Sequence, residues 1–149
     1  MRFRLPIRPL EGIALASLVI LAGAALAQPL AWDQQQVTKT VVDLDHAIDA
    51  LLADPELNSQ QPTAMQQREH TAAVVSAKQL LGCIDTLRRK LGAGYDRDES
   101  WPFWEQCEEL QGDIRTYARH SWLPEATAER AATARKLLDK LDRYYQTQE

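Results

Sequence analysis

The 149-residue sequence is poor in cysteine and glycine, with two cysteines and six glycines. A covalent c-type haem is excluded because the chain has no Cys-x-x-Cys-His motif, and the two cysteines stand too far apart for a thioredoxin-type redox pair. The glycines form no phosphate-binding loop, and neither Gly-x-Ser-x-Gly nor His-Glu-x-x-His occurs. We therefore expect no enzymatic activity and no bound cofactor.

The sequence also lacks the pattern of a β-strand, since no segment alternates apolar and polar residues over about five positions. Apolar residues instead recur at steps of three and four, which is typical of one face of an α-helix. This spacing predicts helices over 34–53, 63–91, 102–121 and 124–145. The predicted fold class is all-α, an antiparallel up-down-up-down four-helix bundle. The outer face of the first helix is acidic and that of the fourth is basic, which favours these two as neighbours.

Only one long apolar run is present, from Ile13 to Ala27. Arginines at positions 2, 4 and 8 precede the run, and it ends in Ala-Leu-Ala, which is typical of a signal-peptidase site. The run is shorter than the roughly 20 apolar residues of a membrane-spanning helix, which argues against an uncleaved anchor. We predict a signal peptide over 1–27, export through the inner membrane of a bacterium, and a single periplasmic domain over 28–149.

Cleavage of the signal peptide removes three arginines and one glutamate, so the mature chain keeps 14 basic and 20 acidic residues and a formal charge of −6. An acidic domain does not suit binding to nucleic acid or to an anionic membrane. No second apolar run is long enough to cross a bilayer, so we expect no stable membrane insertion after cleavage. The expected partner is another periplasmic or secreted protein.

The two cysteines occupy matching places in the second and third predicted helices. Cys83 lies twelve residues before Tyr95 and Cys107 lies twelve after it, so in an antiparallel hairpin centred on Tyr95 they stand level. This arrangement allows the Cα separation of about 5.5–6 Å that a disulfide needs. An oxidising compartment favours the disulfide over two buried free thiols. Gly82 and Gly112 are interpreted as letting the two backbones approach near the bridge.

The segment between these helices is the candidate contact surface, because aromatic and acidic residues alternate along it. Interfaces use aromatic anchors with a charged rim. The predicted partner-binding residues are Tyr95, Asp96, Asp98, Glu99 and Trp101. The alternative is that the aromatic side chains, Phe103 and Trp104 in particular, cap the end of the bundle. The favoured function is a small exported binding or interaction protein without catalysis, such as an inhibitor, an immunity-type protein, a chaperone or an adaptor.

A b-type haem or metal-binding four-helix bundle is the alternative function. His and Met are the axial ligands of haem in four-helix cytochromes. Met65 and His70 fall near the start of the second predicted helix, and His120 falls near the end of the third. An antiparallel bundle brings these two regions to the same end. The competing interpretation is that the two histidines are partly buried residues with local hydrogen bonds.

Overall fold

The computed structural model describes residues 28–146, so the predicted signal peptide over 1–27 lies outside the described residues. Within this range the chain forms helices and no strand. The all-α fold class with four long helices is therefore confirmed. The elements are α1 (Gln34–Leu52), the 3₁₀ helix η1 (Pro55–Asn58), α2 (Ala64–Gly92), α3 (Arg97–Tyr117), the 3₁₀ helix η2 (Ala118–His120) and α4 (Glu125–Tyr145).

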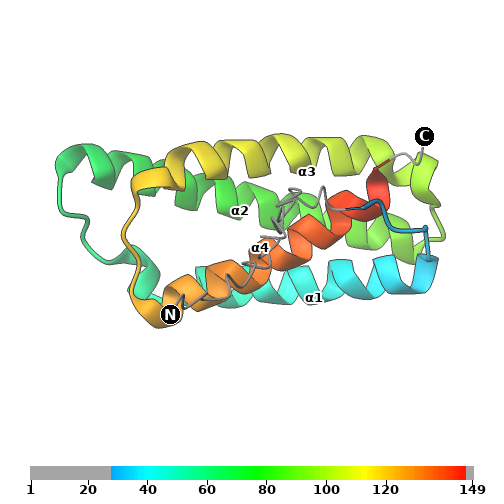
Figure 1. Ribbon diagram of the computed structural model, residues 1–149, viewed down its shortest axis with the longest axis horizontal. Coiled ribbons are helices and arrows are strands. Elements are labelled where there is room, and N and C mark those ends of the chain that lie inside the picture. Colours follow the sequence, from blue (N-terminus) through cyan, green and yellow to red (C-terminus); the bar gives the residue numbers. More distant parts are fainter. Residues whose placement is uncertain (1–27, 147–149) are drawn as a thin grey trace, which may run out of the picture.

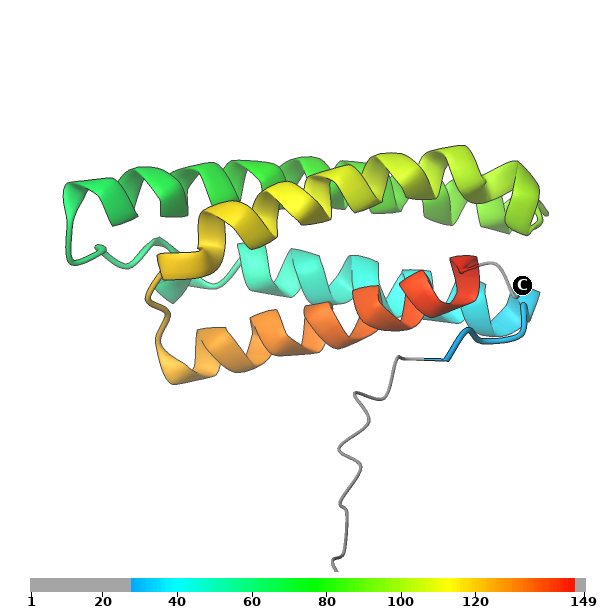
Figure 2. The same cartoon turned by 45° about the horizontal axis from the view of Figure 1, so that its top comes forward.

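The helices form two pairs, and successive helices run in opposite directions (Figure 1). Figure 2 shows α2 and α3 side by side in one layer and α1 with α4 in the other. Hydrogen bonds fix the ends of these helices. The side chain Nε2 of Gln34, at the start of α1, donates to the Tyr95 carbonyl in the α2–α3 turn at 2.8 Å. The Leu30 N–H donates to the Arg143 carbonyl near the end of α4, also at 2.8 Å.

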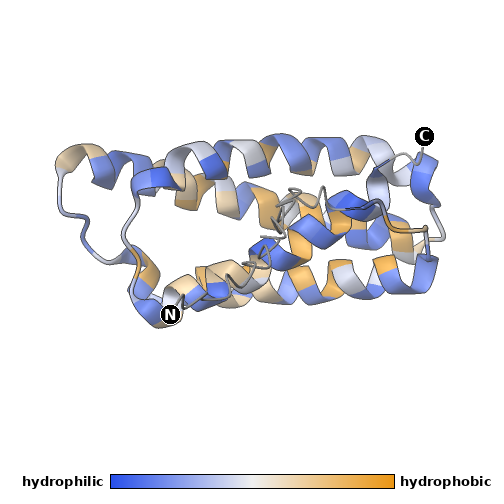
Figure 3. Cartoon of the chain, in the orientation of Figure 1, coloured by the Kyte–Doolittle hydropathy of each residue, from blue (hydrophilic) through white to orange (hydrophobic). Residues whose placement is uncertain are grey.

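The core lies between the two layers, where the apolar faces predicted from the helical spacing meet (Figure 3). Burial of these side chains is the main favourable term in folding. The fully buried residues of the core come from all four helices and include Val37, Val41, Leu44, Ile84, Leu87, Trp104, Cys107 and Leu141. Within residues 28–146, every helix is too short or too polar to span a membrane.

Helix α3 begins five residues earlier than the sequence analysis expects, at Arg97 rather than at Pro102. The cause is a capping box at Asp96. The Glu99 N–H donates to the Asp96 carboxylate at 2.9 Å, and the Asp96 N–H donates to the Glu99 carboxylate at 3.1 Å. These bonds satisfy N–H groups that an uncapped helix start leaves free. Pro102 therefore lies inside α3, where it removes one backbone donor.

The connections at the other end of the bundle also differ from the prediction. Helix α3 ends at Tyr117, and η2 replaces the last turn that was expected to reach Ser121. The predicted linker after α1 contains η1, whose Leu57 is buried. Asp54 caps η1, since its carboxylate accepts the Glu56 N–H at 3.0 Å. Four-residue 3₁₀ helices carry too little periodicity to be read from sequence.

The predicted disulfide joins Cys83 of α2 to Cys107 of α3, with a Cα–Cα distance of 5.7 Å. Cys107 is fully buried and Cys83 lies at the edge of the core, as the position of Cys83 beside its apolar stripe indicates. The interpretation of Gly82 and Gly112 was wrong. A Cβ added to either would meet no heavy atom within 4 Å, so these glycines face open space rather than a neighbouring backbone.

Asp54 ties the end of α1 to the start of α4. The Thr127 hydroxyl donates to its carboxylate at 2.8 Å, and the Arg130 guanidinium pairs with the same oxygen. Within the described residues, no acid of α1 itself pairs with a base of α4: Asp43 pairs with Lys39 of its own helix. Within residues 28–146, the pair of Asp54 with the half-exposed Arg130 is thus the ion pair that joins the end of the first helix to the basic face of the fourth.

Reduction of the disulfide is expected to lower the midpoint temperature of thermal unfolding by about 10 °C or more. The bond joins residues 24 positions apart. Closing a loop of this size stabilises the fold by roughly 3–4 kcal/mol in the chain-entropy model, and each kcal/mol shifts the midpoint by roughly 4 °C in a domain of this length. Circular dichroism melting with and without reductant measures the shift. The double variant Cys83→Ala/Cys107→Ala should melt at about the midpoint of the reduced wild type, and reductant should not change this midpoint. Equal midpoints for the oxidised and reduced wild type would contradict the prediction.

Replacing Asp54 with Asn should lower the free energy of unfolding at neutral pH. It should also make the fall in this free energy between neutral and acidic pH smaller than in the wild type. Hydrogen bonds from Thr127 and the Glu56 N–H, together with the Arg130 charge, hold the pKa of Asp54 below its usual value of 3.8. A lowered pKa stabilises the fold above the usual value, and this contribution disappears as the pH falls through the folded-state pKa. Urea unfolding from pH 7 to pH 2 tests this. Asp49→Asn, which removes an exposed acid of α1, is the matched control. Its stability should fall with decreasing pH as much as that of the wild type.

Candidate functional site

We call Tyr95, Asp96, Asp98, Glu99 and Trp101 the aromatic-acidic end, because the structure places all five at the α2–α3 turn and in the first turns of α3. Trp101 is the most exposed aromatic side chain there, at 39% of its surface. Its ring rests against that of Tyr145 with the centroids 5.9 Å apart. The exposed face of Trp101 is therefore supported from beneath by the core.

Tyr95 is half-buried and packs edge-on against Phe103, with the ring centroids 6.2 Å apart. The Lys90 ammonium lies 5.0 Å from the centroids of both rings. A cation over aromatic faces is attracted to their negative π-clouds. Part of the Tyr95 surface is thus used within the protein, and Phe103 covers the core as the capping alternative expects.

The three acids of the aromatic-acidic end differ in what they do. Asp96 and Glu99 form the capping box of α3, so both carboxylates have a structural role. Asp98 is not part of the capping box: its side chain is 84% exposed and forms an ion pair with the neighbouring Arg97 at 3.2 Å. Asp98 is therefore the acid of this end that a partner can contact without disturbing the capping box of α3.

The centre of this end is Tyr145, the last residue of α4, which is not among the predicted partner-binding residues. Its ring stacks on Trp104 with the centroids 5.2 Å apart and meets Trp32 edge-on at the same distance. The Tyr145 hydroxyl forms a 2.8 Å hydrogen bond with the buried Ser100 hydroxyl. Burial raises the pKa of Tyr145 to about 12, and the bond to Ser100 opposes this only in part. Trp104, fully buried, belongs to the core.

The residues of the haem or metal alternative have other contacts. His70 is buried, and its Nε2 lies 2.6 Å from the Leu57 carbonyl. A carbonyl only accepts, so this nitrogen carries a proton and holds η1 against α2. His120 is exposed and pairs with Glu69 at 3.5 Å, and Met65 is 69% exposed. His70 makes the local hydrogen bond that the competing interpretation expects, but it is buried rather than partly buried and His120 is exposed. The alternative function stays a prediction.

Within residues 28–146, no group of three or more His, Cys, Asp or Glu side chains is placed to hold a metal ion. Comparison with protein-family models, curated proteins and solved structures gives no match to this chain.

Replacing Tyr145 with Phe should cost about 1 kcal/mol of stability at neutral pH, the net value of one hydrogen bond. The folded state also keeps the Tyr145 proton between its usual pKa of 10 and the raised value of about 12, whereas the unfolded state loses it. The stability of the wild type therefore falls as the pH rises through this window, and the variant should show a smaller fall. Urea unfolding between pH 8 and pH 12 measures both effects.

Ser100→Ala is the matched control for this experiment. It removes the same hydrogen bond but keeps the buried phenol, so the alkaline loss of stability should persist. An alkaline limb that is identical in wild type and Tyr145→Phe would show that Tyr145 titrates normally, against the prediction.

Proposed function

We propose that this protein is a small exported binding protein without catalysis, which contacts another protein through its aromatic-acidic end. The observation that carries the proposal is the partial exposure of Trp101 on a surface fixed from below by Tyr145. Tryptophan is among the residues that contribute most to binding at protein interfaces. An inhibitor, an immunity-type protein, a chaperone and an adaptor all fit this kind of surface.

The rigidity of this end supports the proposal. The capping box fixes the start of α3, and the disulfide joins α2 to α3 below the turn. Gln34 ties the turn to α1 through the Tyr95 carbonyl. A surface that is already ordered loses less conformational entropy when a partner binds.

The charge of this end defines the chemistry of the partner. Asp98 is exposed to solvent, lies one helical turn before Trp101, and takes no part in the capping box of α3. A basic segment with an apolar anchor matches this surface, because the anchor covers the indole while the cation meets the carboxylate. A disulfide persists in oxidising compartments, so the Cys83–Cys107 bond favours the proposed location in the periplasm.

The double variant Tyr95→Ala/Trp101→Ala should weaken capture of the natural partner by about 30-fold or more, the effect of losing one strong interface anchor. Its melting midpoint should fall by less than about 10 °C, since neither side chain is fully buried. The measurement is a pull-down from periplasmic extract of the source cells with immobilised protein, quantified by mass spectrometry.

Trp122→Ala is the matched control, because it removes an exposed tryptophan, 54% accessible, from the opposite end of the bundle. A partner that depends on the aromatic-acidic end should bind this control like the wild type. Asp98→Asn tests the charge separately and should weaken capture without lowering the midpoint. Capture that survives in the double variant, together with a fall in the midpoint of 10 °C or more, would assign both aromatics to the core.

A further inference from the structure

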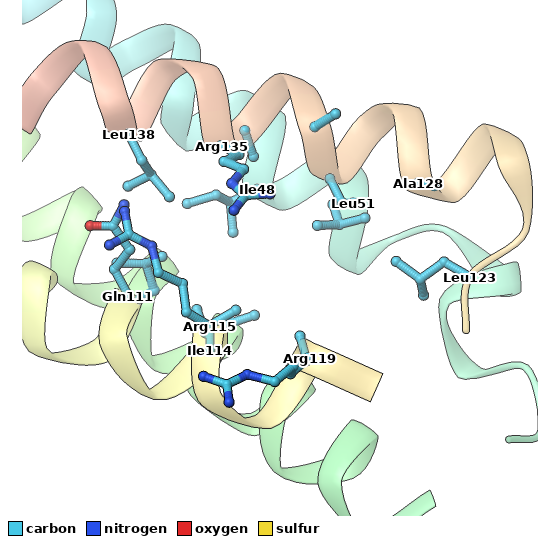
Figure 4. Close-up of a pocket in the computed structure, with 16 residues that line it drawn as sticks. Ile48, Leu51, Gln111, Ile114, Arg115, Arg119, Leu123, Ala128, Arg135 and Leu138 are labelled. Atoms are coloured by element: carbon cyan, nitrogen blue, oxygen red, sulfur yellow. The ribbon is translucent and has the colours of Figure 1, made fainter. Parts of the chain in front are cut away.

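A cavity of about 670 Å³ lies between the two helix layers, at the end of the bundle opposite Trp101 (Figure 4). All four long helices contribute to its walls, and Leu123 of the α3–α4 connection closes one side. The volume is within the range of roughly 300–1,000 Å³ that is usual for small-molecule sites. The aromatic-acidic end is not part of it.

The cavity exists because of the sequence of α4. The first half of this helix lines it with alanines, whose methyl groups are too short to fill the space toward α3: Ala128, Ala131, Ala132 and Ala134. The second half carries Leu141 and Tyr145, which are buried and fill the corresponding space at the other end. Figure 1 shows that α4 crosses the bundle obliquely, with its start well away from α3.

Each polar side chain that lines the cavity carries hydrogen-bond donors. Gln111 of α3 is 4% exposed, and its Nε2 forms no hydrogen bond of normal geometry, although its side chain interacts with the buried carboxylate of Asp142 and lowers the pKa of that group. A ligand acceptor at this amide nitrogen would complete its hydrogen bonding. The other polar members are three arginines at positions 115, 119 and 135, and no acid lines the cavity although acids outnumber bases in the chain.

Two of these arginines are free to meet a ligand. Within the described residues, neither Arg119 nor Arg135 forms an ion pair at 4.0 Å or less. Arg115 has only long contacts, 3.6 Å to Asp139 and 3.8 Å to Asp142. Figure 4 shows Arg115 extending toward Gln111, and Arg135 reaching from α4 into the space between the helices. Burial raises the pKa of Asp142, the more distant of the two acids near Arg115.

We propose that this cavity binds a single-chain amphiphile with a carboxylate head, of the fatty-acid class. The alkyl chain lies along the alanines of α4, opposite Ile48, Leu80 and Ile114, which are the apolar walls. The carboxylate accepts from Gln111 and from the arginines, whose guanidinium groups match carboxylate geometry. A cationic head would be repelled, and a neutral head would leave the arginines without a counter-charge.

The test uses the purified protein with its disulfide intact and cis-parinaric acid, a fluorescent polyene fatty acid, as the probe. Its fluorescence should rise to saturation at one probe per chain, and dodecanoate should displace it. Dodecanol and dodecyltrimethylammonium should compete at least about ten-fold less well, because a charge-assisted hydrogen bond contributes about this factor. Equal displacement by all three amphiphiles, or an unsaturable signal, would overturn the proposal, and so would dodecyl phosphate competing far better than dodecanoate.

Variants locate the site. Arg119→Gln/Arg135→Gln should weaken probe binding by about ten-fold or more. Lys136→Gln is the control: Lys136 lies on the exposed face of α4, next to Arg135, and does not line the cavity. This variant should bind the probe like the wild type.

Ala131→Leu narrows the cavity at the alanines of α4 and should weaken binding. Its melting midpoint should match or exceed that of the wild type, which shows that the fold is intact. Unchanged binding in both the arginine and the leucine variants would place the probe elsewhere and refute the proposal. Tyr95→Ala/Trp101→Ala should bind the probe normally, so failure of the proposed function and failure of this inference give different results.

Discussion

The placement of α4 depends on the burial of Tyr145. This one ring contacts Trp32 before α1 and Trp104 inside α3, while its hydroxyl meets Ser100 in the first turns of α3. Three segments distant in sequence are thereby joined at one end of the bundle. Stacked and edge-on aromatic pairs contribute beyond their buried area, by about 0.5–1.5 kcal/mol each. Burial of the phenol among these rings also raises the pKa of Tyr145, and the hydrogen bond to Ser100 opposes this rise.

The opposite end of α4 is held differently, by the buried carboxylate of Asp54. Helix α4 is thus attached at both ends, and the stretch between them carries alanines where a packed bundle needs larger side chains. The result is a solid aromatic end and a hollow end lined by arginines. The disulfide strengthens the solid end, because it joins α2 to α3 close to Trp104. The two proposed surfaces follow from this asymmetry and lie far apart on the same bundle.

The helical fold and the disulfide were predictable because both depend on local spacing. Apolar residues at steps of three and four define a helix face, and equal distances from Tyr95 place Cys83 level with Cys107. The start of α3 was missed because Pro102 is a stronger sequence signal than the capping box at Asp96, and the box overrode it. The roles of the acids at the candidate site changed with it, since Asp96 and Glu99 serve the helix before any partner.

The sequence by itself determined that four long helices form, which of their faces are apolar, and which cysteines pair, because each follows from periodicity or separation along the chain. Only the tertiary structure decided what those faces meet. It gave Tyr145 its aromatic neighbours, His70 its bond to the Leu57 carbonyl, and Gln111 its place beside Asp142 at the wall of a cavity. These contacts join residues from different helices, and their geometry depends on how far apart the helices pack, which no local pattern encodes.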